Sequence, residues 1–237
     1  MTGDAARAAA LGRYGEALAL SEGTADPALL VVRAVALDRE GRFPEALDSC
    51  SAAIGAAPLD PDAWFVQGLV LYRFSEFEQA AQSLEQAIRL APEHAEARFI
   101  LGNVRFAQGR LDDAIACFEA TVALEPRYAK ALYNIGVALA DQGRFAEALP
   151  YYDRVIAINE SVPAVLLNRG TCLARLERLP EAVEAFTRAL DIDPRHANAW
   201  HNKGLALARL GQDNEAKYCF ARGRALVGLQ VSPGMQP

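Results

Sequence analysis

The fold of this protein is decided by residues 129–162, which read AKALYNIGVALADQGRFAEALPYYDRVIAINESV. The next 34 residues, 163–196, carry the same pattern, with a glycine at position 8 and an alanine at position 20 of each segment. The pattern extends along the chain in both directions. Its small residues at position 8 are Ala34, Gly68, Gly102, Gly136, Gly170 and Gly204, and its alanines at position 20 are Ala46, Ala80, Ala114, Ala148, Ala182 and Ala216. A fixed period of this kind is the sequence signature of a repeat protein.

Each 34-residue segment is expected to form two helices. Apolar residues recur with the helical period, as at Ala131, Leu132, Ile135 and Leu139. Glycine in the middle of the segment, as at Gly143, and proline near the end of four segments mark the breaks between helices. The small residues at positions 8 and 20 allow neighbouring helices to approach closely. The sequence therefore predicts a helix, a turn and a second helix in every segment.

A large residue at position 24 and a proline at position 32 complete the pattern. The residues at position 24 are Cys50, Leu84, Phe118, Tyr152, Phe186 and Phe220. A 34-residue helical hairpin with these features resembles the tetratricopeptide repeat, and Trp64 and Trp200 also match position 4 of that repeat. The resemblance implies an all-α fold, a right-handed superhelical solenoid of antiparallel helix-turn-helix units in which each unit contacts mainly its neighbours.

The resemblance also implies the division of the chain. We expect six units, at residues 27–60, 61–94, 95–128, 129–162, 163–196 and 197–230. Residues 1–26 are expected to form a degenerate, shortened repeat that acts as the N-terminal cap, and residues 231–237 a flexible tail. This array leaves no room for a catalytic domain.

Composition and charge exclude several classes of function. The chain is 52% hydrophobic with a net charge of −6, so it lacks the basic field that sequence-independent nucleic-acid binding requires. No stretch of 18 apolar residues predicts a membrane span, and the first residues lack the order of a secretory signal. We therefore expect a cytoplasmic protein with no nucleic-acid partner and no membrane insertion.

No constellation of catalytic or metal-binding residues stands out. The four cysteines, at 50, 117, 172 and 219, lack metal-ligand spacing and are expected to be free and mostly buried. The three histidines are dispersed, and no glycine-rich phosphate loop occurs. The sequence predicts that the protein is not an enzyme and binds no cofactor or metal.

In tetratricopeptide proteins the concave surface is lined chiefly by the first helix of each unit. Positions 5 and 12 of these helices carry an apolar and aromatic stripe, which the resemblance places in that groove. Its members are Phe65, Tyr72, Phe99, Phe106, Tyr133, Leu167 and His201. If exposed together, the aromatic residues form a patch of the kind that anchors a protein partner. Alternatively, they pack against neighbouring helices.

Asparagines form a second row. Asn134, Asn168 and Asn202 share position 6, and Asn103 stands at position 9 of the preceding unit. An amide both donates and accepts hydrogen bonds, so such a ladder can pair with the backbone of an extended peptide. The row resembles the asparagine ladder in the superhelix of O-linked N-acetylglucosamine transferases. Alternatively, the amides cap adjacent helices or are inherited with the repeat.

Two features of the arginines raise questions. Position 13 carries Arg39, Arg73, Arg175 and Arg209, and the row is interrupted by Ala107 and Asp141 in the two central units. Of these arginines, Arg73, Arg175 and Arg209 are candidates to hold acidic residues of a partner, unless the row reflects a general preference for arginine over lysine. Arg105 stands at position 11, where the other five units carry leucine. We expect its stem to lie along the apolar surface with the guanidinium reaching water or a carboxylate. The alternative is that the third unit opens locally.

The function predicted from the sequence is a non-enzymatic scaffold that binds a peptide or helix of a protein partner in its concave groove. A second hypothesis is a self-assembling structural protein, a homo-oligomer formed through the groove or the terminal helix. A third, an accessory subunit that delivers substrates to a glycosyltransferase, rests on the asparagine row alone.

Overall fold

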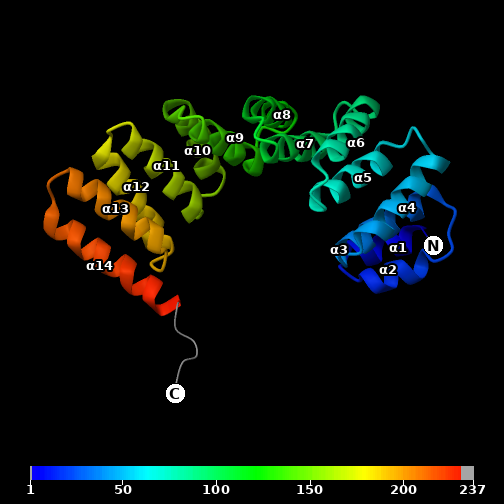
Figure 1. The fold of residues 1–237 in the computed structure, drawn as a ribbon, viewed down its shortest axis with the longest axis horizontal. Helices are drawn as coiled ribbons and strands as arrows, with labels where there is room; N and C mark the ends of the chain where they lie inside the picture. Colours follow the sequence, from blue (N-terminus) through cyan, green and yellow to red (C-terminus); the bar gives the residue numbers. More distant parts are fainter. Residues whose placement is uncertain (1, 231–237) are drawn as a thin grey trace, which may run out of the picture. The chain divides into compact units, whose positions relative to one another are not determined.

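The computed structural model describes residues 2–230 of the chain, with side chains up to Leu226. Within these residues the chain forms fourteen α-helices and no strand, and Figure 1 shows them as a succession of helical hairpins. The all-α prediction is therefore confirmed for the described part of the chain. The helices divide into two units, Met1–Pro126 and Arg127–Pro237. The tail expected at 231–237 lies outside the described residues.

The first unit contains eight helices within its described part. They are α1 (Thr2–Ala10), α2 (Tyr14–Leu20), α3 (Pro27–Arg39), α4 (Phe43–Ala56), α5 (Pro61–Arg73), α6 (Phe77–Leu90), α7 (Ala95–Ala107) and α8 (Leu111–Leu124). Each odd-numbered helix packs on the even-numbered helix that follows it, and successive hairpins pack side by side. The short α1–α2 hairpin covers α3, with Ala8, Ala17 and Ala36 buried between them.

The second unit contains six helices within its described part. They are α9 (Ala129–Asp141), α10 (Phe145–Ile158), α11 (Pro163–Arg175), α12 (Leu179–Ile192), α13 (Ala197–Arg209) and α14 (Asp213–Gln230). Its hairpins stack as in the first unit, and the first helices α9, α11 and α13 contact one another in turn. The first helices of all six longer hairpins begin at residues 27, 61, 95, 129, 163 and 197.

Local sequence signals explain where these helices begin and turn. The Asp26 and Asp60 carboxylates each accept a hydrogen bond from a backbone N–H in the first turn, and a proline follows each of them. At the turn between the two helices the backbone adopts a positive φ, which is +76° at Gly143. Ser75 and Glu177 take the corresponding conformation without a glycine, which carries a cost in backbone strain.

The core of each hairpin is a close approach between position 8 and position 24. The side chains of Phe118, Tyr152 and Phe186 are at most 1% exposed. A Cβ atom added to Gly102 or Gly136 would lie 2.5 to 2.6 Å from the ring of Phe118 or Tyr152. The hairpin of α3 and α4 instead combines Ala34 with the smaller Cys50 in one buried cluster. The sizes of the two positions are therefore matched.

Arg105 on α7 is accommodated as the sequence predicts. Its side chain is 12% exposed, and its guanidinium forms an ion pair with Glu85 and donates a hydrogen bond to Gln108 over 3.1 Å. The helix runs unbroken through this residue. The expectation that the head reaches a carboxylate is confirmed, and the alternative of a locally open third hairpin is wrong.

A second ion pair joins two hairpins of the first unit. Asp38 on α3 is 2% exposed, and one of its oxygens pairs with the Arg73 guanidinium of α5. The other carboxylate oxygen, Oδ1, has no hydrogen-bond partner among the described residues. Burial raises the pKa of the Asp38 carboxyl above its usual value, and the opposing effect of Arg73 is smaller. The site thus favours the protonated acid more than water does.

The size match between positions 8 and 24 can be tested with Gly102→Ala. We expect this substitution to lower the free energy of unfolding by about 1–3 kcal/mol, because the new methyl group overlaps the Phe118 ring. Urea unfolding measures the effect. In a Phe118→Cys background, which copies the Ala34 and Cys50 pair, Gly102→Ala should cost little. An equal cost in both backgrounds would contradict the size match.

The buried carboxyl predicts a pH dependence of stability. Because the folded-state pKa of Asp38 is raised, its protonated form stabilises the fold at low pH, and this contribution is lost as pH rises through the raised pKa. Asp38→Asn stays neutral, so the variant should gain stability relative to the wild type as pH rises above about 4, the ordinary pKa of an aspartate. Thermal unfolding across this range measures the difference. A constant difference would show that Asp38 titrates as in the unfolded chain.

Candidate functional site

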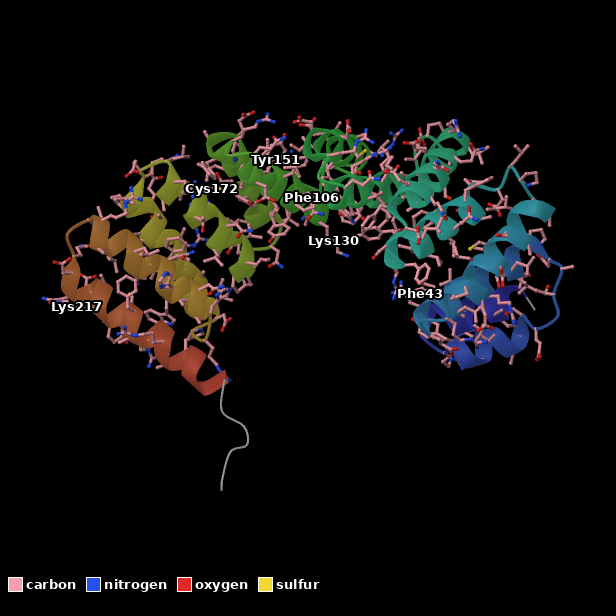
Figure 2. The ribbon with its side chains drawn as sticks, viewed as in Figure 1. Phe43, Phe106, Lys130, Tyr151, Cys172 and Lys217 are labelled. Carbon is pink, nitrogen blue, oxygen red and sulfur yellow. The ribbon has the colours of Figure 1, made fainter. Side chains whose placement is uncertain are left out.

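Two pockets adjoin on the first-helix side of the second unit. The pocket between α9 and α11, called the α9–α11 pocket, has a volume of about 230 Å³ and is lined by Val137, Ala140, Asp141, Phe145, Tyr152, Asn168, Thr171 and Cys172. The α11–α13 pocket measures about 240 Å³ and is lined by Thr171, Ala174, Arg175, Phe186, Asn202, Leu205, Ala206 and Arg209. Cys172, labelled in Figure 2, comes from α11. Thr171 lines both pockets, so the two are neighbours along the array.

The two pockets are the same structure built one repeat apart. Almost every residue that lines the second pocket lies 34 positions after a residue that lines the first. Their chemistry nevertheless differs. In the order of the chain, Asp141, Tyr152, Thr171 and Cys172 of the first pocket are replaced by Arg175, Phe186, Leu205 and Ala206 in the second. The first pocket is therefore the more polar of the two and carries an acidic residue, and the second is more apolar and carries two arginines.

Each pocket contains one of the predicted asparagines. The Asn168 side-chain nitrogen donates a hydrogen bond to the Tyr133 hydroxyl over 3.0 Å, and the Asn202 nitrogen approaches the Thr171 hydroxyl at 3.5 Å. Both amides thus point their nitrogen atoms toward the preceding repeat. Neither carbonyl oxygen accepts a hydrogen bond from the described residues, so both remain for a ligand. Asn134, the third member of the row, is half-buried on α9.

The position-13 arginines also reach back to the preceding repeat. Arg175 lies over the Phe145 ring, 5.1 Å from its centroid, and Arg73 lies over Phe43, labelled in Figure 2, at 5.9 Å. Arg209 donates to the Ala174 carbonyl over 3.2 Å and pairs with Glu177. Two of the three arginines therefore already bind carboxylates of this chain. That they hold acidic residues of a partner stays a prediction.

The aromatic stripe is not uniformly exposed. Phe99 on α7 is only 8% exposed and packs against Phe118, so for this residue the alternative of internal packing applies. Phe65, Tyr72, Phe106, Tyr133 and Leu167 are half-buried, and His201 is exposed. Several of them pair with a ring of the same unit, as Phe65 does with His94 at 4.6 Å between centroids. Asn103 is half-buried on the same helix as Phe99.

Sequence reasoning missed the environment of Tyr152. Its side chain is fully buried, and its hydroxyl has no hydrogen-bond partner among the described residues although it lines the α9–α11 pocket. Burial raises the pKa of this hydroxyl, and the Asn168 amide opposes the shift. The signal in the sequence was a tyrosine at position 24, where three other units carry phenylalanine.

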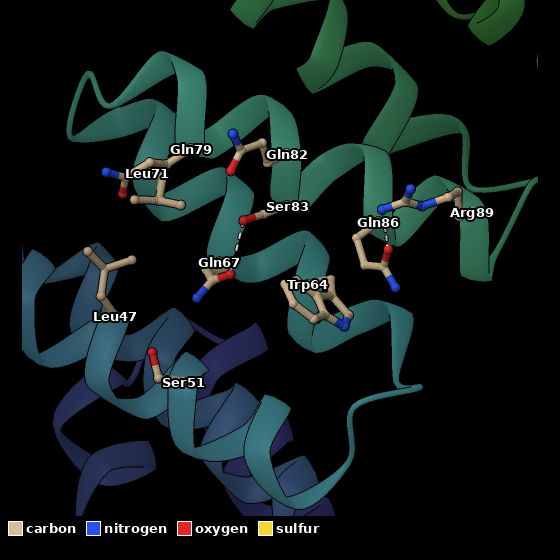
Figure 3. A pocket seen from close by; sticks show the side chains of 10 residues that line it. All are labelled: Leu47, Ser51, Trp64, Gln67, Leu71, Gln79, Gln82, Ser83, Gln86 and Arg89. Carbon is tan, nitrogen blue, oxygen red and sulfur yellow. Dashed lines mark hydrogen bonds between the residues drawn. The ribbon is translucent and has the colours of Figure 1, made fainter.

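A further pocket, which sequence reasoning missed, lies on α4, α5 and α6 of the first unit. Its volume is about 490 Å³ (Figure 3), and its lining residues are Leu47, Ser51, Trp64, Gln67, Leu71, Gln79, Gln82, Ser83, Gln86 and Arg89. The Ser83 hydroxyl donates to Gln67 over 3.0 Å, and Arg89 donates to Gln86. Four glutamines within one segment were the available signal.

The described residues carry no cluster of three histidine, cysteine or acidic side chains that could hold a metal ion. Within residues 2–230 no helix has the length and apolar character needed to cross a membrane. The four cysteines are free. Burial raises the pKa of the Cys50 thiol to about 12 and that of Cys172 to about 11, so both are neutral at physiological pH.

Solved structures share this fold. The crystal structure of YrrB, described as a TPR protein with an unusual peptide-binding site, is 24% identical, with 76% of this chain and 93% of YrrB covered and a TM-score of 0.69. MamA from Desulfovibrio magneticus RS-1, from residue 41 to its end, is 22% identical, covering 73% and 97%, with a TM-score of 0.70. PilF of Pseudomonas aeruginosa is 18% identical, covering 86% and 91%, with a TM-score of 0.71. These similarities show a common fold.

Family models account for nearly the whole described chain. A model described as a tetratricopeptide repeat matches residues 3–61, 65–116 and 101–163. Two others with the same description match residues 163–196 and 185–218. No match was found among the curated proteins. With these matches and the stacked helical hairpins of both units, the chain belongs to the tetratricopeptide repeat family.

Proposed function

We propose that the first-helix groove of the second unit binds an extended segment of a partner protein, and that the protein is a non-enzymatic scaffold. One observation carries the proposal. The two pockets that meet at Thr171 each place an asparagine carbonyl and a position-24 ring beside a different rim charge. A row of side-chain pockets with backbone-pairing groups between them is how extended peptides are recognised.

The amides suit the backbone of such a segment. Asn168 and Asn202 keep their carbonyl oxygens for a ligand because their nitrogens are engaged with the preceding repeat. An extended peptide presents backbone N–H donors at regular intervals, so these two oxygens can accept hydrogen bonds from it whatever its side chains are. Tyr133, Leu167 and His201, half-buried or exposed on the same helices, add surface for apolar contact.

The size of the groove agrees with a peptide more than with a compact small molecule. Each pocket offers about 230–240 Å³, which is less than the roughly 300–1,000 Å³ of a pocket for a drug-sized ligand and is suited to a single side chain. The fold similarity to YrrB, whose description names a peptide-binding site, supports the same interpretation.

The last hairpin argues against self-assembly as the leading function. Its outer side carries His201 and Arg224 at positions 5 and 28, where the preceding hairpin buries Leu167 and Leu190 against α13. Polar residues at these positions suit contact with water and disfavour stacking with a second copy. The hollow of about 400 Å³ between α13 and α14 is lined by these two side chains.

Light scattering during size exclusion tests the choice between the two functions. We expect the mass of one chain over the whole concentration range, because His201 and Arg224 stand where the preceding hairpin has leucines. The substitutions His201→Leu and Arg224→Leu should create self-association, since they restore the buried pattern of the preceding hairpin. A concentration-dependent mass of the wild type would instead favour a homo-oligomer.

Peptide display tests the binding function. We expect a random library of twelve-residue peptides, panned on the full chain, to yield peptides that bind one per chain by fluorescence anisotropy. Asn168→Ala combined with Asn202→Ala should weaken the best peptide by at least about fivefold, because two hydrogen bonds are lost.

The control for this experiment is Asn214→Ala. Asn214 is exposed on α14, away from the groove residues, so its loss should leave the affinity unchanged. Circular dichroism verifies that helix content is the same in all variants. Failure to recover any peptide, or equal affinity of the double variant, would rule out this mode of binding.

A further inference from the structure

The α9–α11 pocket contains a polar atom that the fold leaves unsatisfied. The Tyr152 side chain is fully buried, and its hydroxyl makes no hydrogen bond to any described residue. The ring is fixed in place by Gly136, where an added Cβ would lie 2.6 Å from ring atom Cε1. A buried hydroxyl without a partner has lost its hydrogen bonds to water, so it does not contribute to the stability of the fold.

The groups around this hydroxyl leave acceptors, and few donors, in the pocket. The Asn168 nitrogen is directed to Tyr133, and the Thr171 hydroxyl donates to the Leu167 carbonyl over 2.9 Å. The Asn168 carbonyl oxygen and the lone pairs of the Tyr152 oxygen are therefore available. The Cys172 thiol is neutral and only a weak donor. The Tyr152 O–H is itself a donor, and the Asn168 amide is close enough to act on it. With that hydrogen directed to the Asn168 carbonyl oxygen, the remaining lone pairs of the two oxygens suit a ligand that donates hydrogen bonds.

The rim of the pocket carries the Asp141 carboxylate, and the Arg175 guanidinium lies over the Phe145 ring of the lining, 5.1 Å from its centroid. Asp141 ends α9, is exposed, and forms no ion pair with the described residues. Burial is the largest cause that raises the pKa of the Tyr152 hydroxyl, and the charge of Asp141 adds to it after Cys172 and Tyr133. Val137 and Phe145 add apolar side chains to the lining. The pocket thus combines apolar walls, buried acceptors and a carboxylate at its mouth.

The α11–α13 pocket shows that the buried hydroxyl and the carboxylate of the α9–α11 pocket are not general features of the repeat. At the equivalent positions it carries Phe186 in place of the tyrosine and Arg175 in place of the aspartate. It retains Asn202 at the position of Asn168. The two pockets therefore share a shape and a backbone-pairing amide, and they differ in the groups that select a side chain.

We propose that the α9–α11 pocket is a subsite for a lysine side chain of the bound segment. This proposal rests on the proposed function for its peptide. The methylene stem lies along Val137 and Phe145, and the ammonium donates to the Tyr152 hydroxyl oxygen and the Asn168 carbonyl oxygen. Asp141 balances the charge at the rim. A volume of about 230 Å³ accommodates one such side chain.

Two peptide measurements test this subsite. We expect the displayed twelve-residue peptides that bind the wild type to share a lysine at one position, and those selected on Tyr152→Phe to lose it. Replacing that lysine by norleucine keeps the stem and removes the ammonium. It should weaken binding to the wild type about tenfold, and binding to Tyr152→Phe much less. Equal effects of norleucine on both proteins would overturn the subsite.

The variant is expected to fold, because phenylalanine occupies the same position in three other hairpins. Tyr152→Phe removes an unsatisfied group, so its thermal midpoint should not fall. Tyr218→Phe is the matched control, since Tyr218 is 59% exposed on α14 and should leave lysine selection intact. Selection of acidic or apolar residues in place of lysine by the wild type would also count against the proposal.

A probe without a peptide separates this inference from the proposed function. N-acetyl-lysine methylamide and its norleucine analogue are titrated into protein labelled with ¹³C at the tyrosine ring carbon Cζ, and the Tyr152 signal is assigned with Tyr152→Phe. We expect the lysine compound alone to shift this signal. A shift without any peptide binder would overturn the proposed function only, whereas peptide binders without a lysine-dependent shift would overturn the subsite only.

Discussion

The structure depends on the contact between a small residue in the first helix of a hairpin and a large one in the second. At Gly136 and Tyr152, as at Gly102 and Phe118, the ring lies where a Cβ atom would be. This contact sets how closely the two helices approach, and every hairpin then presents the same surface to the next one. Because the contact recurs every 34 residues, the first helices of the second unit line up and form pockets between them. The groove is thus a by-product of core packing.

Polar contacts between repeats are built on top of this packing. Arg73, Arg175 and Arg209 each reach back to a residue of the preceding hairpin, by an ion pair, a ring contact or a carbonyl. Asn168 and Asn202 do the same through their amide nitrogens. Nearest-neighbour coupling of this kind is what makes the stability of a repeat array a sum of unit and interface terms. It also holds these side chains in fixed positions, which under the proposed function lowers the entropic cost of binding a partner.

The period of the sequence was sufficient to predict the helices and the side of the hairpin on which a site should lie. The spacing of Gly136 and Gly170 defines the register, and register alone identifies which residues share a helix face. It did not predict that Phe99 packs inside its unit or that Tyr152 lacks a partner, since both depend on the surrounding side chains in three dimensions. The glutamine-lined pocket on α4, α5 and α6 was missed for a similar reason, because its residues come from two repeats. Arg105 was predicted correctly because a lone cation at an apolar position has few acceptable environments.

Thr171 lines one wall of the α9–α11 pocket and the opposite wall of the α11–α13 pocket. A single repeat therefore encodes two half-pockets, one on each side of its first helix, and a complete pocket exists only at a junction. Recombination or duplication of a whole repeat would create a new junction with walls from different parents, and so a new side-chain preference, without any point mutation. Conversely, a substitution at residue 171 alters the lining of two neighbouring pockets together.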